Sequence, residues 1–171
     1  MKILAIGDVV SKQGCDYLRK TLPALKRELM ADVVIVNGEN SAVGNGILPG
    51  SAQFIFDSGA DVITLGNHGL RRREIYPMLD ENEFLVRPLN YHPSAPGRGT
   101  AVLDMGRCQV AIINLQGAAY MEPIQNPFDA AEAEIERLKD LGVNIIVIDF
   151  HAEATAEKRA LGFFLDGRIS A

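Results

Sequence analysis

The sequence predicts an α/β fold in which parallel strands alternate with helices. Apolar runs rich in Val and Ile recur at residues 2–7, 32–37, 61–66 and 144–149. None alternates between apolar and polar residues, so each is typical of a strand buried on both faces of a parallel sheet. Segments with helical periodicity follow the first two runs and precede the fourth. This order of strand and helix implies right-handed parallel crossovers.

Apolar spacing and end signals predict three helices. Over residues 14–30, leucines recur at spacings of four, three and four residues, which gives this helix one apolar face. Pro23 lies inside the segment and is expected to kink it. A short helix is predicted over residues 51–60, with a Ser cap at its start and Gly59 near its end. The helix over residues 126–142 is acidic early and Lys-bearing late, as the helix dipole favours.

The middle of the chain departs from this alternation. Residues 99–117 hold two strand-like runs around the turn at 104–107, which predicts an antiparallel pair at a sheet edge or in a second sheet. Residues 87–99 are rich in Pro and Gly and are expected to form an ordered surface loop.

Length and charge place bounds on the class of protein. The chain has 171 residues, which suits a single domain over residues 1–171. Lys and Arg number 17 against 22 Asp and Glu, so no basic stripe for stable nucleic-acid binding is expected. The two cysteines are far apart in sequence, which favours a reducing compartment. No signal peptide or membrane span is indicated, and we expect a cytoplasmic protein.

One short basic run, Arg71-Arg72-Arg73, has two interpretations. Because Glu74 follows it, a solvated helix start is the simpler one. The alternative is a guanidinium cluster that receives an anionic substrate beside Asn67 and His68.

Polar side chains follow every one of the four buried runs, where the carboxyl ends of parallel strands meet. Carboxylate, carboxamide and imidazole together suit divalent ions such as Mn²⁺, Fe²⁺ or Zn²⁺. A glutamate at the second strand end is placed to bridge two such ions. The set comprises Asp8, Glu39, Asn40, Asn67, His68 and His151.

Single polar residues after strands also have ordinary structural explanations. Asp8 by itself suits a turn or a helix cap, and His151 by itself suits a hydrogen-bonded structural role. Asp149 suits either a partner of a metal ligand or a plain strand-end acid. His92 is given only a structural role. The coincidence at four strand ends is what favours a site.

Four motifs resemble the calcineurin-like metallophosphoesterases. They are "GDVV" at 7–10, "NGEN" at 37–40, "GNH" at 66–68 and "DFHAEAT" at 149–155. Within that family, the chain is most similar to a bacterial branch of cyclic-nucleotide phosphodiesterases. The resemblance implies a four-layer α/β/β/α sandwich of two mixed sheets with helices outside.

The resemblance also implies a role for each site residue. Asp8 and Asn40 resemble ligands of a first metal, and Glu39 resembles a carboxylate that bridges both ions. Asn67 and His151 resemble ligands of the second metal, while His68 resembles the histidine that protonates the leaving oxygen. The implied cofactors are two divalent ions, Fe or Mn first, with Zn or Mg as alternatives.

The implied reaction is hydrolysis of cyclic nucleotides by a hydroxide that bridges the two ions, with 2′,3′-cyclic nucleotides first and 3′,5′-cyclic nucleotides as a further candidate. The expected partner is therefore a small phosphoester or cyclic-nucleotide substrate. A homo-oligomer is also compatible with the sequence. Two alternatives stay open. One is a nucleotide-binding or interaction module with weak or no catalysis, and the other is a phosphomonoesterase.

The chain departs from the family pattern at two places. Gly69, Leu70 and Arg71 follow "GNH", where the family usually has Thr-Trp-Asp, so a different pocket wall is expected. The Gly-x-His-x-His element, which supplies one further ligand to each metal, is absent from a chain with three histidines. The prediction is therefore a sandwich that is incomplete at its C-terminal end, from a truncated enzyme or a shortened homologue.

Overall fold

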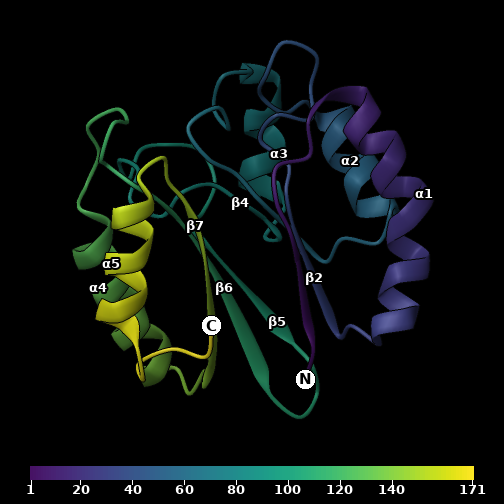
Figure 1. Ribbon diagram of the computed structural model, residues 1–171. Coiled ribbons are helices and arrows are strands. Elements are labelled where there is room, and N and C mark those ends of the chain that lie inside the picture. The colour runs from purple at the N-terminus through teal and green to yellow at the C-terminus, as the bar shows by residue number, and fades with distance from the viewer.

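The computed structural model describes residues 1–171 and has four layers, with helices outside two facing sheets (Figure 1). Sheet A has the order β1-β2-β3-β4 and sheet B the order β5-β6-β7. The strands are β1 (Ile3–Ile6), β2 (Val33–Asn37), β3 (Val62–Thr64), β4 (Leu85–Val86), β5 (Thr100–Asp104), β6 (Gln109–Gln116) and β7 (Ile145–His151). The helices are α1 (Ser11–Leu29), α2 (Pro49–Asp57), the 3₁₀ helix η1 (Arg73–Ile75), α3 (Tyr76–Glu81), α4 (Pro127–Asp140) and α5 (Thr155–Leu165).

The continuous apolar run of β2 follows from its place between two cores. Val34 and Val36 pack outward with α1, α2 and α3, while Val33 and Ile35 pack inward against sheet B. Successive side chains of a strand point to opposite faces, so both faces of β2 demand apolar residues. The core between the sheets comprises Val33, Ile35, Val62, Val86, Ala101, Val110, Ile112 and Val147.

Sheet A is parallel throughout, although the resemblance implied two mixed sheets. Its strands β2 and β3 are buried along their whole length, as predicted, and so is β4. The edge strand β1 is only half-buried and exposes Ala5, so the expectation of burial on both faces was wrong there. An edge strand has a neighbour on one side only, and apolar composition does not reveal this.

Sheet B contains the predicted hairpin, since β5 and β6 pair antiparallel from Thr100 opposite Ile113 to Asp104 opposite Gln109. The fourth apolar run forms β7, which pairs parallel with β6. The prediction grouped this run with the first three, whereas β7 lies in the other sheet. Any buried parallel strand has the same composition, so the run does not specify which sheet it joins.

The helices agree with their predicted positions, with differences at the ends. α1 is a single unbroken helix with Pro23 inside it. α2 begins at Pro49, and Ser51 lies in its first turn, where the Ser51 hydroxyl accepts a hydrogen bond from the Leu48 amide at 3.0 Å. The N-cap is Leu48, so the predicted Ser cap was three residues too late. α4 is capped by Asn126, whose side chain accepts from the Phe128 amide at 2.9 Å.

The loop over residues 87–99 is ordered but is not entirely at the surface. Arg87 is 6% exposed and Asn90 is fully buried, so the prediction of a surface loop was wrong for the first half. Arg87 donates to the carbonyls of Pro88 and Leu89 at 2.8 and 3.2 Å, and burial lowers the pKa of its guanidinium. The short elements β4 and α3 were not predicted, and neither was the eleven-residue helix α5.

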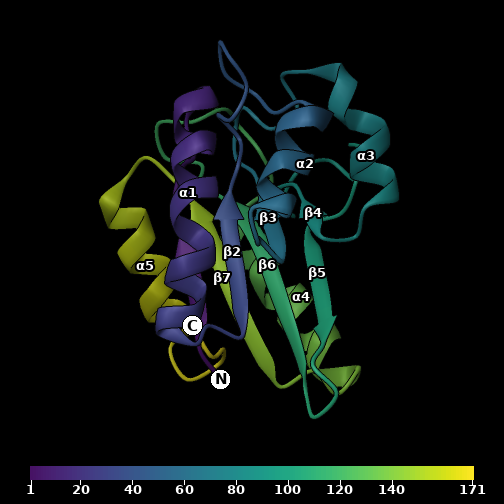
Figure 2. The same ribbon diagram turned by 90° about the vertical axis from the view of Figure 1, so that its right-hand side faces the viewer.

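No helix is long and apolar enough to span a membrane. Both cysteines are free thiols, and Cys15 is buried. The two chain ends lie together at the lower end in Figures 1 and 2, and in Figure 2 the arrowhead of β2 points to the upper end. The carboxyl ends of the parallel strands and the loops that follow them are therefore at the end opposite the termini.

Candidate functional site

Backbone hydrogen bonds join the segments that follow β1 and β2 to each other and to the ends of β2 and β3. The Val9 amide donates to the Asn37 carbonyl at 2.9 Å, and the Ser11 amide donates to the Asn40 carbonyl at 2.8 Å. The Gly38 amide donates to the Thr64 carbonyl at 3.0 Å. These bonds position the side chains that follow each strand, although the loops have no regular structure.

Glu39 is the centre of the site and is 1% exposed. Its carboxylate accepts hydrogen bonds from the His68 amide at 2.9 Å and from the Asn40 amino group at 3.2 Å. Its Oε1 also lies 3.5 Å from His68 Nδ1 and 3.4 Å from His151 Nε2. One carboxylate thus contacts residues from the loops after β2 and β3 and the last residue of β7.

The remaining predicted residues join the same network. The Asn40 amino group donates to both oxygens of Asp8 at 3.0 and 3.1 Å, and Asn40 Oδ1 lies 3.0 Å from His68 Nδ1. Asn67 Oδ1 lies 2.9 Å from His151 Nε2. The structure therefore brings together all six predicted residues, with Asp8 and Asn67 exposed and the other side chains partly or fully buried.

The position of Gly66 leaves no room for a side chain, because the two sheets meet there. A Cβ atom there would lie 2.5 Å from Cδ2 of the His151 ring and would also collide with the Glu39 carboxylate. Real Cβ atoms do not approach other atoms so closely, so only glycine allows the turn before Asn67 to pass between these two groups.

Side-chain hydrogen bonds across the two sheets support this turn. Asn114 on β6 is fully buried, and its amino group donates to the Leu65 and Val86 carbonyls at 2.7 and 3.1 Å. The Thr64 hydroxyl on β3 donates to Asp149 on β7. Asp149 therefore has a structural contact: it joins β7 to β3 through Thr64. This hydrogen bond of its side chain is not to a predicted metal ligand.

Tyr91 is a site residue that the sequence did not single out. Its hydroxyl lies 2.7 Å from Gln116 Oε1 and 3.1 Å from the Gly66 carbonyl, and it donates its proton toward these two acceptors. Burial raises the pKa of Tyr91, and the nearby charges of Glu39 and Glu122 raise it further. The hydroxyl is therefore protonated at neutral pH and available as a donor. The only sequence signal for Tyr91 was its place in the "RPLNY" stretch.

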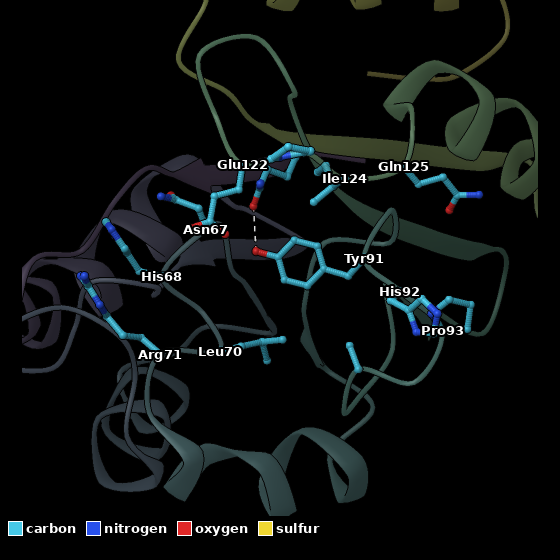
Figure 3. A pocket seen from close by; sticks show the side chains of 13 residues that line it. Asn67, His68, Leu70, Arg71, Tyr91, His92, Pro93, Glu122, Ile124 and Gln125 are labelled. Carbon is cyan, nitrogen blue, oxygen red and sulfur yellow. Dashed lines mark hydrogen bonds between the residues drawn. The ribbon is translucent and has the colours of Figure 1, made fainter.

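A cavity of about 940 Å³ opens beside Asn67 and His68. Figure 3 shows Tyr91 in its middle, with His68 and Arg71 on one side and His92 and Pro93 on the other. Residues from the loops after β3, β4 and β6 form its walls. It is the size of an ordinary small-molecule site.

The three arginines after "GNH" have different positions, and each of the two interpretations fits some of them. Arg72 donates to the carbonyls of Val43 and Asn45 at 2.9 and 3.2 Å and so supports the preceding loop. Arg73 begins η1, as a solvated helix start would. Arg71 lines the cavity beside His68, which is the position that the anion-receiving interpretation required. His92, given only a structural role, also lines the cavity.

The donor set suits a divalent cation. Neither Asp8 nor the buried Glu39 has a Lys or Arg partner, and the ionic neighbours of Glu39 are two imidazoles. Burying a carboxylate costs free energy when it has no positive partner. In this structure the amino group of Asn40 donates to both acids, Asp8 and Glu39. No three side chains among His, Cys, Asp and Glu are grouped to hold an ion by themselves, so an ion here needs the carboxamide oxygens of Asn40 and Asn67.

The fold is that of the calcineurin-like metallophosphoesterases: two sheets packed face to face, helices outside, and polar loops at the carboxyl ends of the parallel strands. NAD nucleotidase from Haemophilus influenzae shares this architecture at 15% identity, with a TM-score of 0.69 over 94% of this chain and 39% of that chain. At this identity the comparison concerns the fold alone.

The chain belongs to the YmdB-like protein family, whose sequence profile matches residues 4–171. It is 42% identical over its whole length to a 2′,3′-cyclic-nucleotide 2′-phosphodiesterase from Bacillus subtilis and covers 64% of that protein. A crystal structure from Mycoplasma pneumoniae, described as a novel phosphatase, matches 99% of this chain and 62% of its own with 32% identity and a TM-score of 0.91. The chain thus spans less than two thirds of the length of these relatives.

Proposed function

We propose that this chain carries the metal-dependent active site of a phosphodiesterase that hydrolyses cyclic nucleotides, with 2′,3′-cyclic nucleotides as the first candidates. The observation that carries the proposal is Glu39, a buried carboxylate without a Lys or Arg partner among residues from three strand ends. The name of the Bacillus subtilis relative supports the substrate class.

Two divalent ions, Fe or Mn before Zn or Mg, would be held by residues already gathered here. Asp8 and Asn40 would bind the first ion, Asn67 and His151 the second, and Glu39 both, since its carboxylate adjoins both groups. When bound, the ions supply charge neutralisation of the phosphate oxygens and lower the pKa of a bound water.

His68 is suited to hold a proton for the leaving oxygen. Its Nδ1 lies 3.0 Å from the side-chain oxygen Oδ1 of Asn40. An amide oxygen only accepts hydrogen bonds, so this contact requires the proton on Nδ1. This contact orients the ring, so that Nε2 is the atom that faces away from Asn40 and is free to donate a proton to the leaving oxygen. A general acid of this kind contributes roughly 10²- to 10⁴-fold in rate.

Substitution of Glu39 tests the proposal. Glu39→Gln keeps the size of the side chain and removes its charge, so we expect the loss of tight Mn²⁺ binding in calorimetry. We also expect hydrolysis of 2′,3′-cyclic AMP to fall by on the order of 10³-fold, the size of effect seen when one strong electrostatic contact to a transition state is lost.

Glu28→Gln is the matched control, because Glu28 is an exposed acid on α1. It should leave Mn²⁺ binding and turnover unchanged. Metal-dependent hydrolysis that is equal in the Glu39 variant and the unmodified protein would refute the proposal.

A second candidate is a module that binds a nucleotide without hydrolysing it. It is favoured by the absence of three clustered His, Cys, Asp or Glu side chains, because carboxamides are weaker metal ligands. Calorimetry separates the two candidates: a cyclic nucleotide that binds and is recovered intact in the presence of Mn²⁺ supports the module. Assays of 3′,5′-cyclic AMP and a phosphomonoester alongside would establish which ester the site prefers.

A further inference from the structure

The cavity beside His68 contains apolar side chains that no hydrophobic core uses. Tyr91 and Ile124 belong to none of the three cores and pack at the edge of none, yet both are half-buried and line the cavity. Leu70 faces them across it (Figure 3). Apolar surface held away from a core marks a place where a ligand binds.

The Tyr91 ring is fixed in position. Its hydroxyl is bonded toward Gly66 and Gln116, as described above, so the ring cannot turn away from the cavity. A ring fixed in this way offers a flat apolar face, on which a planar group of the ligand can stack.

Two glutamines supply hydrogen-bonding groups to the same cavity. Gln116 is 1% exposed and lines the cavity, and its Oε1 lies 2.7 Å from the Tyr91 hydroxyl. Gln125 is exposed and also lines the cavity. A side-chain amide at the wall of a cavity offers hydrogen bonds to a polar ligand atom.

One buried residue positions both glutamines. Asn90 is fully buried, and its amino group donates to the carbonyl of Gln116 at 2.7 Å and to that of Gln125 at 2.9 Å. Its Oδ1 accepts from the Gln116 amide at 3.0 Å. Since Asn90 fixes the backbone of both residues, the polar side of the cavity is built and not incidental.

We infer that this cavity is the subsite for the nucleoside of the substrate, with the base stacked on Tyr91 between Leu70 and Ile124. A nucleobase is planar, apolar on its faces and rich in donors and acceptors at its edge, and Gln116 and Gln125 match that edge. The inference rests on the proposed function in one respect only. If His68 protonates the leaving ribose oxygen, the base attached to that ribose would lie in the cavity, because His68 is part of its wall.

Binding of nucleosides that carry no phosphate tests the subsite without catalysis or metal. Adenosine, guanosine, cytidine and uridine would be titrated into protein labelled at the Ile δ1 and Leu methyl groups, followed by NMR. We expect at least one nucleoside to shift the Ile124 and Leu70 signals. We also expect Ile124→Ala to weaken binding by about tenfold, which is typical for partial loss of an apolar pocket wall.

Leu141→Ala is the matched control, because Leu141 is an apolar residue that is 63% exposed after α4 and lies outside the cavity. It should leave nucleoside binding unchanged. Gln125→Ala, at an exposed position that does not endanger folding, should weaken binding of the preferred base and alter the order of the four nucleosides.

A comparison of substrates then separates the subsite from the chemistry. The ratio of kcat/KM for the preferred 2′,3′-cyclic nucleotide to that for glycerol 1,2-cyclic phosphate isolates the contribution of the base, since both contain a five-membered cyclic phosphate. This ratio should fall about tenfold in Ile124→Ala. Nucleoside binding without any hydrolysis would support the subsite and count against the proposed function. Hydrolysis with no methyl shift from any nucleoside, or with an unchanged ratio, would overturn the subsite alone.

Discussion

The two sheets contribute to the site in different ways. The loops after the strands of sheet A provide Asp8, Glu39, Asn40, Asn67 and His68, whereas sheet B provides one predicted residue, His151. Sheet B instead provides the supporting contacts, with Asn114 and Gln116 on β6 and Asp149 on β7. One sheet therefore gathers the charged and polar groups, and the other holds them in place.

Strand length explains much of this difference. β3 and β4 have three and two residues, so the chain leaves sheet A early and forms long loops. β6 and β7 have eight and seven residues, and His151 is still the last residue of its strand. Groups on regular strands are held more rigidly than groups on loops, which suits sheet B for support and sheet A for the reactive loops.

The largest effect should come from the point where the sheets meet. Gly66→Ala would force the turn before Asn67 away from Glu39 and His151, because a Cβ there collides with both. A displacement of about 1 Å costs on the order of 10²-fold in rate, so turnover of 2′,3′-cyclic AMP should fall by that amount. The free energy of unfolding should also fall by about 1–3 kcal/mol, as for other overpacked sites.

Gly162→Ala is the control for that experiment. Gly162 lies within α5 with no atom within 4 Å of the position of an added Cβ. The substitution should raise the free energy of unfolding by about 0.5–1 kcal/mol through helix propensity and leave turnover unchanged. Full activity in the Gly66 variant would mean that sheet B does not constrain the site.

The next largest effect should come from the support beneath the turn. Asn114→Ala leaves the carbonyls of Leu65 and Val86 buried without their donor, and each unpaired group costs about 1–3 kcal/mol. We expect the free energy of unfolding, measured by urea denaturation, to fall by about 3 kcal/mol. Asn144→Ala, at the exposed position just before β7, should change it by less than about 0.5 kcal/mol. Equal values for the two variants would contradict the supporting role of β6.

The smallest effect concerns an ion pair on α4, which packs on sheet B away from the site. Glu134 on α4 accepts from Arg137 at 2.6 and 2.8 Å and from Thr100 on β5 at 2.6 Å. Burial by itself would raise the pKa of Glu134, but these hydrogen bonds outweigh it and hold the pKa below its usual value. The ionised form is therefore favoured by folding.

Because the folded pKa is depressed, the stabilisation is fully present above the pKa of the unfolded chain and is lost as pH falls through the folded pKa. Glu134→Gln should lower the free energy of unfolding by about 1 kcal/mol at pH 7, and this difference should shrink toward pH 3. Glu136→Gln, an exposed position on the same helix, is the control. Neither variant should change turnover, and a difference that persists at low pH would contradict the assignment.

Much of the site was predictable because its residues follow buried strands. The apolar runs located β1, β2, β3 and β7, and in parallel strands the carboxyl ends share one end of the molecule. Glu39 and His151 are therefore found together in the structure, 3.4 Å apart, although 112 positions separate them in sequence. The hairpin of β5 and β6 was predictable for a similar reason, since its turn residues lie between two strand-like runs.

The cavity was not predictable in the same way. Tyr91, Gln116 and Ile124 lie in or next to irregular segments with no periodicity, and each is a common residue in such segments. Their shared position depends on Asn90, whose hydrogen bonds connect two separate loops. Contacts of this kind between distant residues leave no local pattern in the sequence.

The sequence by itself determined which residues end the strands and which chemical groups those ends carry, because burial of a strand on both faces imposes a continuous apolar run. Only the tertiary structure decided that β7 belongs to a second sheet, that Gly66 passes between Glu39 and His151, and that a cavity opens beside His68. The physical reason is that strand composition reports burial, whereas the choice of neighbours depends on how two whole sheets pack against each other.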